Sequence, residues 1–239
     1  MAFVNIGSGA IVKVVSGFIE IPDHPRGSAD YRALGAGLID ALGPYEGLIF
    51  DSDQNKVEGT WLAQYLRSGQ NITHSVADNP AKNTLAYHCV QHEKLAWLAG
   101  AAEGDVLGAA SNATRPADTY VWIDYGILHV PGVTAAVIRS FLDRISSFGA
   151  SVLMPGCWPR REVPHDIPCW RFCGGLIVVP RPLLKLFVRV AQATAVRQIM
   201  STRNVEWEVN TLARVELLDQ VPITWYEADH DQTMFTGAP

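Results

Sequence analysis

The feature that most constrains this chain is an apolar run over residues 120–129, which carries a single carboxylate, Asp124, near its middle. A β-branched and aromatic run of this kind predicts a buried strand. A carboxylate inside such a run is costly unless it is paired, hydrogen-bonded or bound to a metal. Two interpretations follow: Asp124 ends the strand and caps a turn at Gly126, or the strand delivers Asp124 to a site at its carboxyl end, where α/β sheets bind ligands.

The segments around this run alternate between strand and helix patterns. Residues 10–21 predict a first strand, residues 29–42 an amphipathic helix that stops at Gly43, and residues 47–51 a second strand. A chain that opens strand, helix, strand predicts parallel pairing and an α/β fold.

Further strands are expected over 151–155, 170–180 and 223–226, and further helices over 60–67, 83–102, 134–148, 182–200 and 205–218. Residues 104–118 are small and polar, which predicts a loop. The length fits one domain over residues 1–239.

Composition and the absence of certain motifs exclude several classes of function. The chain is 48% hydrophobic and has a net charge of −5 without a basic block, which argues against nucleic-acid binding. No segment has the length of a membrane span, and the N-terminus lacks a leader pattern, so the cytoplasm is the expected compartment. Phosphate-binding and dinucleotide glycine motifs and a nucleophile elbow do not occur.

Two groups of side chains suggest metal chemistry only weakly. Asp51 and Asp53 could bind a divalent cation or form a solvated turn. Cys169 and Cys173 are four residues apart, but no second close cysteine pair accompanies them, so free buried thiols are the expected state of the four cysteines.

The order of the motifs resembles GT-A-type glycosyltransferases. The strand with Asp124 is followed by a strand containing Gly174 and Gly175, by an acidic helix with Glu206 and Glu208, and by a terminal Asp-His pair that ends at His230. Among these enzymes the chain looks most like the bacterial HtrL-type family, whose members carry a Trp-x-Asp-x-Gly strand. The resemblance implies one domain with a mixed, mostly parallel central sheet flanked by helices.

The resemblance also implies a function. A sugar would pass from a UDP-linked nucleotide-sugar donor to a glycan or other hydroxyl acceptor, with the help of Mn²⁺ or Mg²⁺. Asp124 and His230 would hold the metal, and Glu208 or Glu206 would be the catalytic carboxylate. The donor would contact residues along the whole chain, namely Ser16, Gly17, Phe18, Lys94, Asp124, Gly174 and Gly175.

Each implied role has a structural alternative. Lys94 could be a surface lysine whose stem covers the core, the glycine pair could be a β-bulge, and His230 could be a surface residue. Gly126 stands where the resembled motif has its second acid. That departure leaves open a non-catalytic nucleotide-sugar-binding protein, and a nucleotidyltransferase is a third, weaker reading because the loop after the first strand is not basic and glycine-rich.

Overall fold

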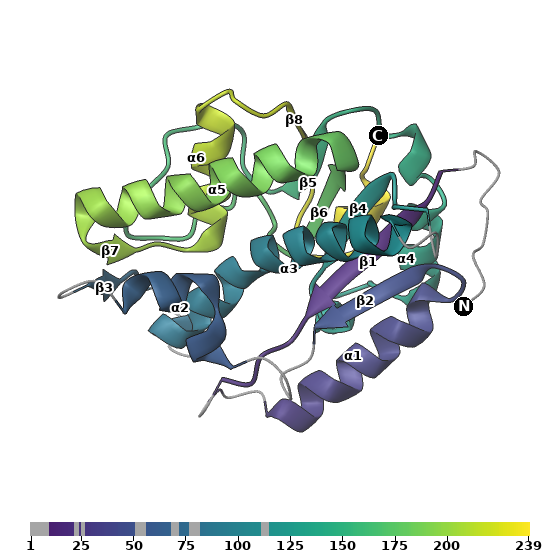
Figure 1. The fold of residues 1–239 in the computed structure, drawn as a ribbon, viewed down its shortest axis with the longest axis horizontal. Helices are drawn as coiled ribbons and strands as arrows, with labels where there is room; N and C mark the ends of the chain where they lie inside the picture. Colours follow the sequence, from purple (N-terminus) through teal and green to yellow (C-terminus); the bar gives the residue numbers. More distant parts are fainter. Residues whose placement is uncertain are drawn as a thin grey trace.

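The computed structural model describes residues 10–21, 24, 27–50, 56–67, 72–76, 82–110 and 115–239, without the side chains of 106–110. Its centre is a six-stranded sheet in the order β2-β1-β4-β6-β5-β8 (Figure 1). The strand β6 runs antiparallel to both of its neighbours, and the other pairs are parallel. The mixed, mostly parallel sheet is thus confirmed. The six strands are β1 (Val12–Gly17), β2 (Glu46–Phe50), β4 (Thr119–Ile123), β5 (Val152–Gly156), β6 (Leu176–Pro180) and β8 (Ile223–Glu227).

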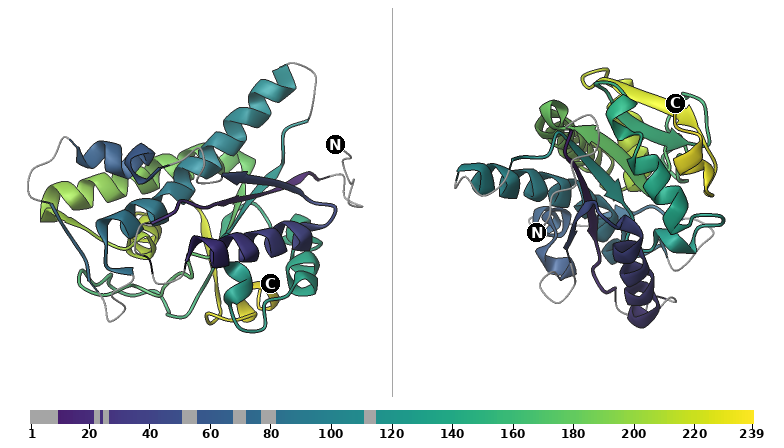
Figure 2. Two further views of the ribbon diagram at one scale, coloured as in Figure 1. Left: turned by 90° about the horizontal axis from the view of Figure 1, so that it is seen from below. Right: turned by 90° about the vertical axis from the view of Figure 1, so that its right-hand side faces the viewer.

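Helices cover both faces of this sheet, as the two orthogonal views also show (Figure 2). One apolar cluster joins the sheet to α3 (Leu85–Ala110), α5 (Arg181–Thr202) and α6 (Glu208–Leu217). The other joins it to α1 (Ser28–Leu42), α4 (Ala135–Leu142) and α7 (Thr233–Thr236).

The strand residues alternate between these two clusters. In β4, Trp122 packs into the cluster beneath α3, whereas Val121 and Ile123 pack into the cluster beneath α1. Burial on both faces explains why this strand reads as an unbroken apolar run rather than as an alternating one.

The opening strand, helix and strand form the expected parallel unit, in which Val15 of β1 pairs with Leu48 of β2. Smaller elements lie beside the main sheet: α2 (Trp61–Leu66), a parallel pair of β3 (Thr73–His74) with β7 (Asn204–Val205), and the 3₁₀ turns η1 (Val57–Gly59), η3 (Ile127–His129) and η4 (Ile145–Ser147). None of the described helices combines the length and the apolarity that a membrane span requires.

Two expected strands are shorter than their apolar runs. The run that begins at residue 120 ends as a strand at Ile123, because the Asp124 carbonyl accepts a hydrogen bond from the Ile127 amide and the chain turns into η3. The run over 170–180 is a strand only over Leu176–Pro180, so the glycine pair lies in the turn before β6 and is not a β-bulge within it.

Two expected helix limits were also wrong. The helix α3 continues to Ala110, through the first half of the expected loop 104–118. Its buried Asp105 accepts hydrogen bonds from the Tyr120 hydroxyl at 2.7 Å and the Ala117 amide at 3.2 Å, which fastens the extra turns to the sheet. The helix α6 begins at Glu208, so Glu206 precedes it.

Candidate functional site

A cavity opens where the strand order changes direction. The chain leaves β1 toward β2 on one side and leaves β4 toward β5 on the other, so the carboxyl ends of β1 and β4 flank a crevice. A cavity of about 460 Å³ lies at this point, between the first turns of α1 and α3. Its position is the usual ligand site of an open α/β sheet, and its size is within the range of small-molecule sites.

Aromatic rings form much of the cavity wall. Phe18, which follows β1, stacks on Tyr125 with ring centroids 5.3 Å apart and lies 5.5 Å from the ring of Tyr31. On the α3 side, Tyr87 stacks on His24 at 6.3 Å. Burial is the main cause that raises the pKa of Tyr87 well above its usual value, so this phenol is neutral near pH 7. Such a wall offers flat surfaces to a planar ligand.

Asp124 brings a carboxylate to the cavity. Its side chain is 38% exposed, and one oxygen accepts a hydrogen bond from the Trp122 indole nitrogen at 2.7 Å. Its amide donates to the Gly175 carbonyl at 3.0 Å, so the backbone at both ends of the turn is fixed. Both interpretations of this residue therefore apply, because Asp124 ends the strand and also faces the cavity.

Lys94 is the buried cation of the site. Its side chain is 2% exposed, and its ammonium donates to the Gly174 carbonyl at 2.8 Å and to the Glu208 carboxylate at 3.1 Å, while Asp124 lies at 3.6 Å. This is not a lysine that reaches past the core to solvent, as the alternative reading proposed. Its position within α3 places the ammonium at the carboxyl end of β4.

Charge pairing keeps this group of residues ionised. Burial disfavours the charged form of Lys94, but Asp124 and Glu208 outweigh it and the pKa of Lys94 is raised. Burial likewise disfavours the Glu208 carboxylate, but Lys94, followed by His92, lowers its pKa. Two carboxylates therefore share one ammonium, and the group carries one net negative charge beside the cavity.

The glycine pair has a structural reason at this place. A side chain at Gly174 would put its first carbon 2.3 Å from the Glu208 carboxylate and 3.1 Å from the Lys94 nitrogen. At Gly175 the same carbon would lie 3.5 Å from an Asp124 oxygen. The glycine motif therefore marks a close approach, as expected, but to the ion pair of Lys94 and Glu208.

The residues at the end of β1 divide into two sets. Gly17 and Phe18 line the cavity. Gly17 leaves room for the Trp97 ring, because a first side-chain carbon at this position would lie 2.4 Å from a ring atom of Trp97. Ser16 is fully buried within β1 and is not part of the cavity wall, and its hydroxyl has no hydrogen-bond partner among the described residues.

Gly126 also lies in the cavity wall, at the place of the absent second acid. A first side-chain carbon there would lie 3.0 and 3.2 Å from two atoms of the Tyr31 ring. Tyr31 thus occupies the space into which a residue at this position would begin to extend.

Glu206 belongs to a different network. Its buried carboxylate pairs with Arg214 at 3.0 Å and with His165 at 2.7 Å, and it accepts a hydrogen bond from Gln198 at 2.7 Å. It does not line the cavity. The structure therefore separates the two expected catalytic carboxylates, with Glu208 at Lys94 and Glu206 in this second network.

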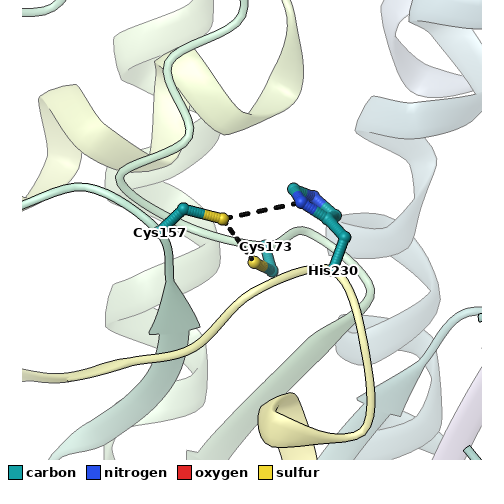
Figure 3. A group of neighbouring side chains, drawn as sticks. All are labelled: Cys157, Cys173 and His230. Atoms are coloured by element: carbon teal, nitrogen blue, oxygen red, sulfur yellow. Dashed lines mark hydrogen bonds between the residues drawn. The ribbon is translucent and has the colours of Figure 1, made fainter. Parts of the chain in front are cut away.

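His230 lies in a group of thiols. Its Nδ1 atom is 3.5 Å from the sulfur of Cys157, whose sulfur is 3.7 Å from that of Cys173 (Figure 3). Within the described part of the chain, this trio is the compact group of three potential metal ligands, and Asp124 is not in it. The expected metal site of Asp124 with His230 therefore stays a prediction, and the acidic pair Asp51 and Asp53 lies outside the described residues.

Sequence reasoning missed several residues of the cavity wall. They were read only as helix or strand formers, or not at all, because their convergence depends on how α1 and α3 pack across the sheet. The wall residues with rings or polar groups that had not been named as site residues are Glu20, His24, Ser28, Tyr31, Lys82, Tyr87, Gln91, Trp97, Trp122, Tyr125 and His129. The imidazole of His129 is held by a hydrogen bond with the Gly126 carbonyl.

Among known proteins, the chain is similar to solved structures, of which 22 chains match. No protein-family model matches the chain, and no curated protein matches it. One solved structure with a similar chain path is a glycosyltransferase involved in the glycosylation of the major capsid of PBCV-1; it aligns over 92% of this chain and 81% of that chain, with 11% identity and a TM-score of 0.48. The resemblance to HtrL-type proteins therefore stays a prediction, and function is argued below from this chain's own residues.

Proposed function

We propose that this protein is a glycosyltransferase that binds a nucleotide-sugar donor in the cavity at the carboxyl ends of β1 and β4. The observation that carries the proposal is the combination of an aromatic wall with a half-exposed carboxylate, Asp124, at the point where the strand order reverses. A nucleotide sugar needs both features, because its base offers a flat face and its sugars offer hydroxyl donors.

The parts of the donor can be assigned to parts of the wall. The base would stack among Phe18, Tyr31 and Tyr87, since base stacking on aromatic side chains tolerates any base. Asp124 would accept hydrogen bonds from sugar hydroxyls, and a carboxylate makes these stronger than a neutral acceptor would. Lys82 and His24, which line the same cavity, could face the diphosphate.

A hard divalent ion does not fit the residues expected to hold it. Mn²⁺ and Mg²⁺ prefer oxygen ligands, but His230 faces two thiols, the second acid is replaced by Gly126, and Glu208 is occupied by Lys94. We therefore assign no step to a metal at Asp124. In its place, Lys94 neutralises part of the charge of Asp124 and fixes its position.

This arrangement changes the role that we propose for Glu208. Its carboxylate is buried and paired, so it is a positioning residue for Lys94 rather than a base that reaches an acceptor hydroxyl. The same observation favours a second candidate, a non-catalytic nucleotide-sugar-binding protein. Both candidates predict donor binding, and only the first predicts turnover.

The binding proposal is tested by titration calorimetry of the full chain with a panel of nucleoside diphosphates, each with a chelator and again with Mn²⁺. We expect binding of at least one of them to the wild type, and a loss of about 10-fold or more in affinity for Asp124→Asn, since a hydrogen bond to a charged group contributes about 1.5–3 kcal/mol. Asp166→Ala, an exposed loop residue, is the matched control. Equal affinity of wild type and Asp124→Asn, or no binding across the panel, would refute the proposal.

The two candidates are separated by following release of the nucleoside diphosphate from a panel of nucleotide sugars, with and without hydroxyl acceptors. Release that the wild type catalyses and Asp124→Asn loses would support the transferase. Binding in the calorimeter without any release would support the binding protein.

A further inference from the structure

The trio of Cys157, Cys173 and His230 comes from three separate segments that meet at one edge of the sheet (Figure 3). Cys157 directly follows β5, and His230 lies in the loop after β8. Cys173 lies in the turn before β6, and because β6 is antiparallel, that turn is at the same edge as the carboxyl ends of β5 and β8.

The distances in the trio match those between ligands of a tetrahedral zinc ion. With Zn–S near 2.3 Å and Zn–N near 2.05 Å, tetrahedral angles place two sulfurs about 3.8 Å apart and a sulfur and a nitrogen about 3.6 Å apart. The corresponding distances here are 3.7 Å between the two sulfurs and 3.5 Å from the Cys157 sulfur to Nδ1 of His230. All three ligand atoms lie within 4.8 Å of one another.

The backbone holds the two thiols in place without any ion. The Cys157 amide donates to the Trp170 carbonyl at 2.9 Å, and the Cys173 amide donates to the Pro155 carbonyl at 2.8 Å. Gly156 allows this approach, because a side chain there would put its first carbon 1.7 Å from the Arg171 carbonyl oxygen.

The imidazole is supported as well. The ring of His230 meets that of Trp170 edge to face, with centroids 4.5 Å apart. Just before it, the Ala228 amide donates to the Gly156 carbonyl at 3.0 Å. The three groups are thus arranged by their own elements, as a preformed ligand set requires.

We propose that Cys157, Cys173 and His230 bind one zinc ion, with a water molecule at the fourth position. Thiolates and an imidazole select zinc over the hard ions Mn²⁺ and Mg²⁺. On binding, each thiol gives up its proton to solvent, and the two thiolates balance the charge of the ion. Because His230 is exposed, the fourth position faces water.

Such an ion would connect segments that follow β5 and β8 with the turn that precedes β6. It would tie the loop after β8 to the turn of Cys173, which continues into Gly174 and Gly175 and so into the contacts of Lys94 and Asp124. The proposal does not depend on glycosyl transfer, since it rests on the ligand set alone.

The test is the zinc content of the purified full chain, stripped with a chelator, reloaded with zinc and dialysed. We expect one zinc per chain in the wild type and in the control Cys169→Ala, whose thiol lies outside the trio. Cys157→Ser should lose the ion, and His230→Gln should weaken zinc binding by at least about 10-fold. Replacing even a residue that only hydrogen-bonds to a metal ligand lowers metal affinity by about 10-fold or more. The exposed position of His230 makes that variant safe for folding.

Cobalt gives a second readout of the same site. Co²⁺ bound to two thiolates in a tetrahedron should show a sulfur-to-metal charge-transfer band in the wild type that Cys157→Ser lacks. Three results would overturn the proposal. The first is that the wild type retains no zinc, and the second is that Cys157→Ser and His230→Gln each retain as much zinc as the wild type. The third is a Cys157–Cys173 disulfide, found by thiol counting in the protein as purified without reductant.

Discussion

At the scale of single residues, the site depends on one buried charge. Lys94 is the shared partner of Asp124 and Glu208, and it also satisfies the Gly174 carbonyl. A buried ion pair is a weak source of net stability, but removing one partner leaves the other charge buried and unpaired. The cost of losing Lys94 should therefore exceed that of an ordinary surface lysine.

We predict that Lys94→Met lowers the free energy of unfolding by about 3–5 kcal/mol, the usual cost of breaking a buried pair from one side. Urea unfolding monitored by tryptophan fluorescence measures it. The double variant Lys94→Met with Glu208→Gln should recover part of the loss, and the exposed control Lys185→Met should be near neutral. A loss below about 1 kcal/mol for Lys94→Met would contradict the pairing described here.

Gly126 gives a second prediction at this scale. Gly126→Asp would supply the acid that the resembled motif has, but its side chain would start 3.0 Å from the Tyr31 ring. We expect a loss of about 1–3 kcal/mol in unfolding free energy from this crowding. The loss should shrink when the same change is made in a Tyr31→Ala background. An equal loss in both backgrounds would show that Tyr31 is not the obstacle.

At the scale of elements, the contact of α2 with α3 contains an acid that is unfavourable when ionised. The Glu93 carboxylate accepts a hydrogen bond from the Trp61 amide at 2.8 Å, but burial raises its pKa from 4.5 to about 7. The folded chain therefore keeps this proton between about pH 4.5 and 7 while the unfolded chain loses it. Stability from this group falls as the pH rises through that window.

We predict that Glu93→Gln removes that fall, which is at most about 3 kcal/mol at 1.36 kcal/mol per pKa unit. Urea unfolding of wild type and variant at pH 5 and pH 8 measures it, and the variant should gain stability relative to the wild type at the higher pH. The buried His88, whose pKa burial lowers to about 4, changes both proteins alike and cancels in the difference. The same pH dependence in both proteins would contradict the prediction.

Elements were also what the sequence predicted best. The parallel opening unit and the helices α1 and α5 followed from apolar periodicity, because each buries one face against the sheet. The ends were harder to predict. The strand β4 stops at Ile123 because of a turn hydrogen bond at Asp124, which is one of the two roles expected of that residue. The helix α3 extends to Ala110 because Asp105 is bonded to a distant strand, and this cause has no local sequence signal.

The site was predictable only where a residue was unusual in its own segment. Asp124, Lys94 and the glycine pair stood out as polar or small groups in apolar runs, and the structure brings them together around one ion pair. The thiol and imidazole trio could not be foreseen, because its members are 16 and 73 residues apart along the chain. They meet only because β5 pairs with both the antiparallel β6 and the parallel β8.

At the scale of the whole molecule, the strand order places two features along one edge of the sheet. The cavity lies at the carboxyl ends of β1 and β4, and the zinc ligands lie at those of β5 and β8. Between them, the turn of Cys173 and Gly174 connects the two places. The central claim is that the first of these binds a nucleotide-sugar donor.

The most direct test of that claim is a crystal structure of the full chain soaked with UDP. The proposal predicts the uracil among Phe18, Tyr31 and Tyr87, with a ribose hydroxyl donating a hydrogen bond to Asp124. UDP bound elsewhere on the molecule, or an empty cavity at saturating UDP, would contradict it.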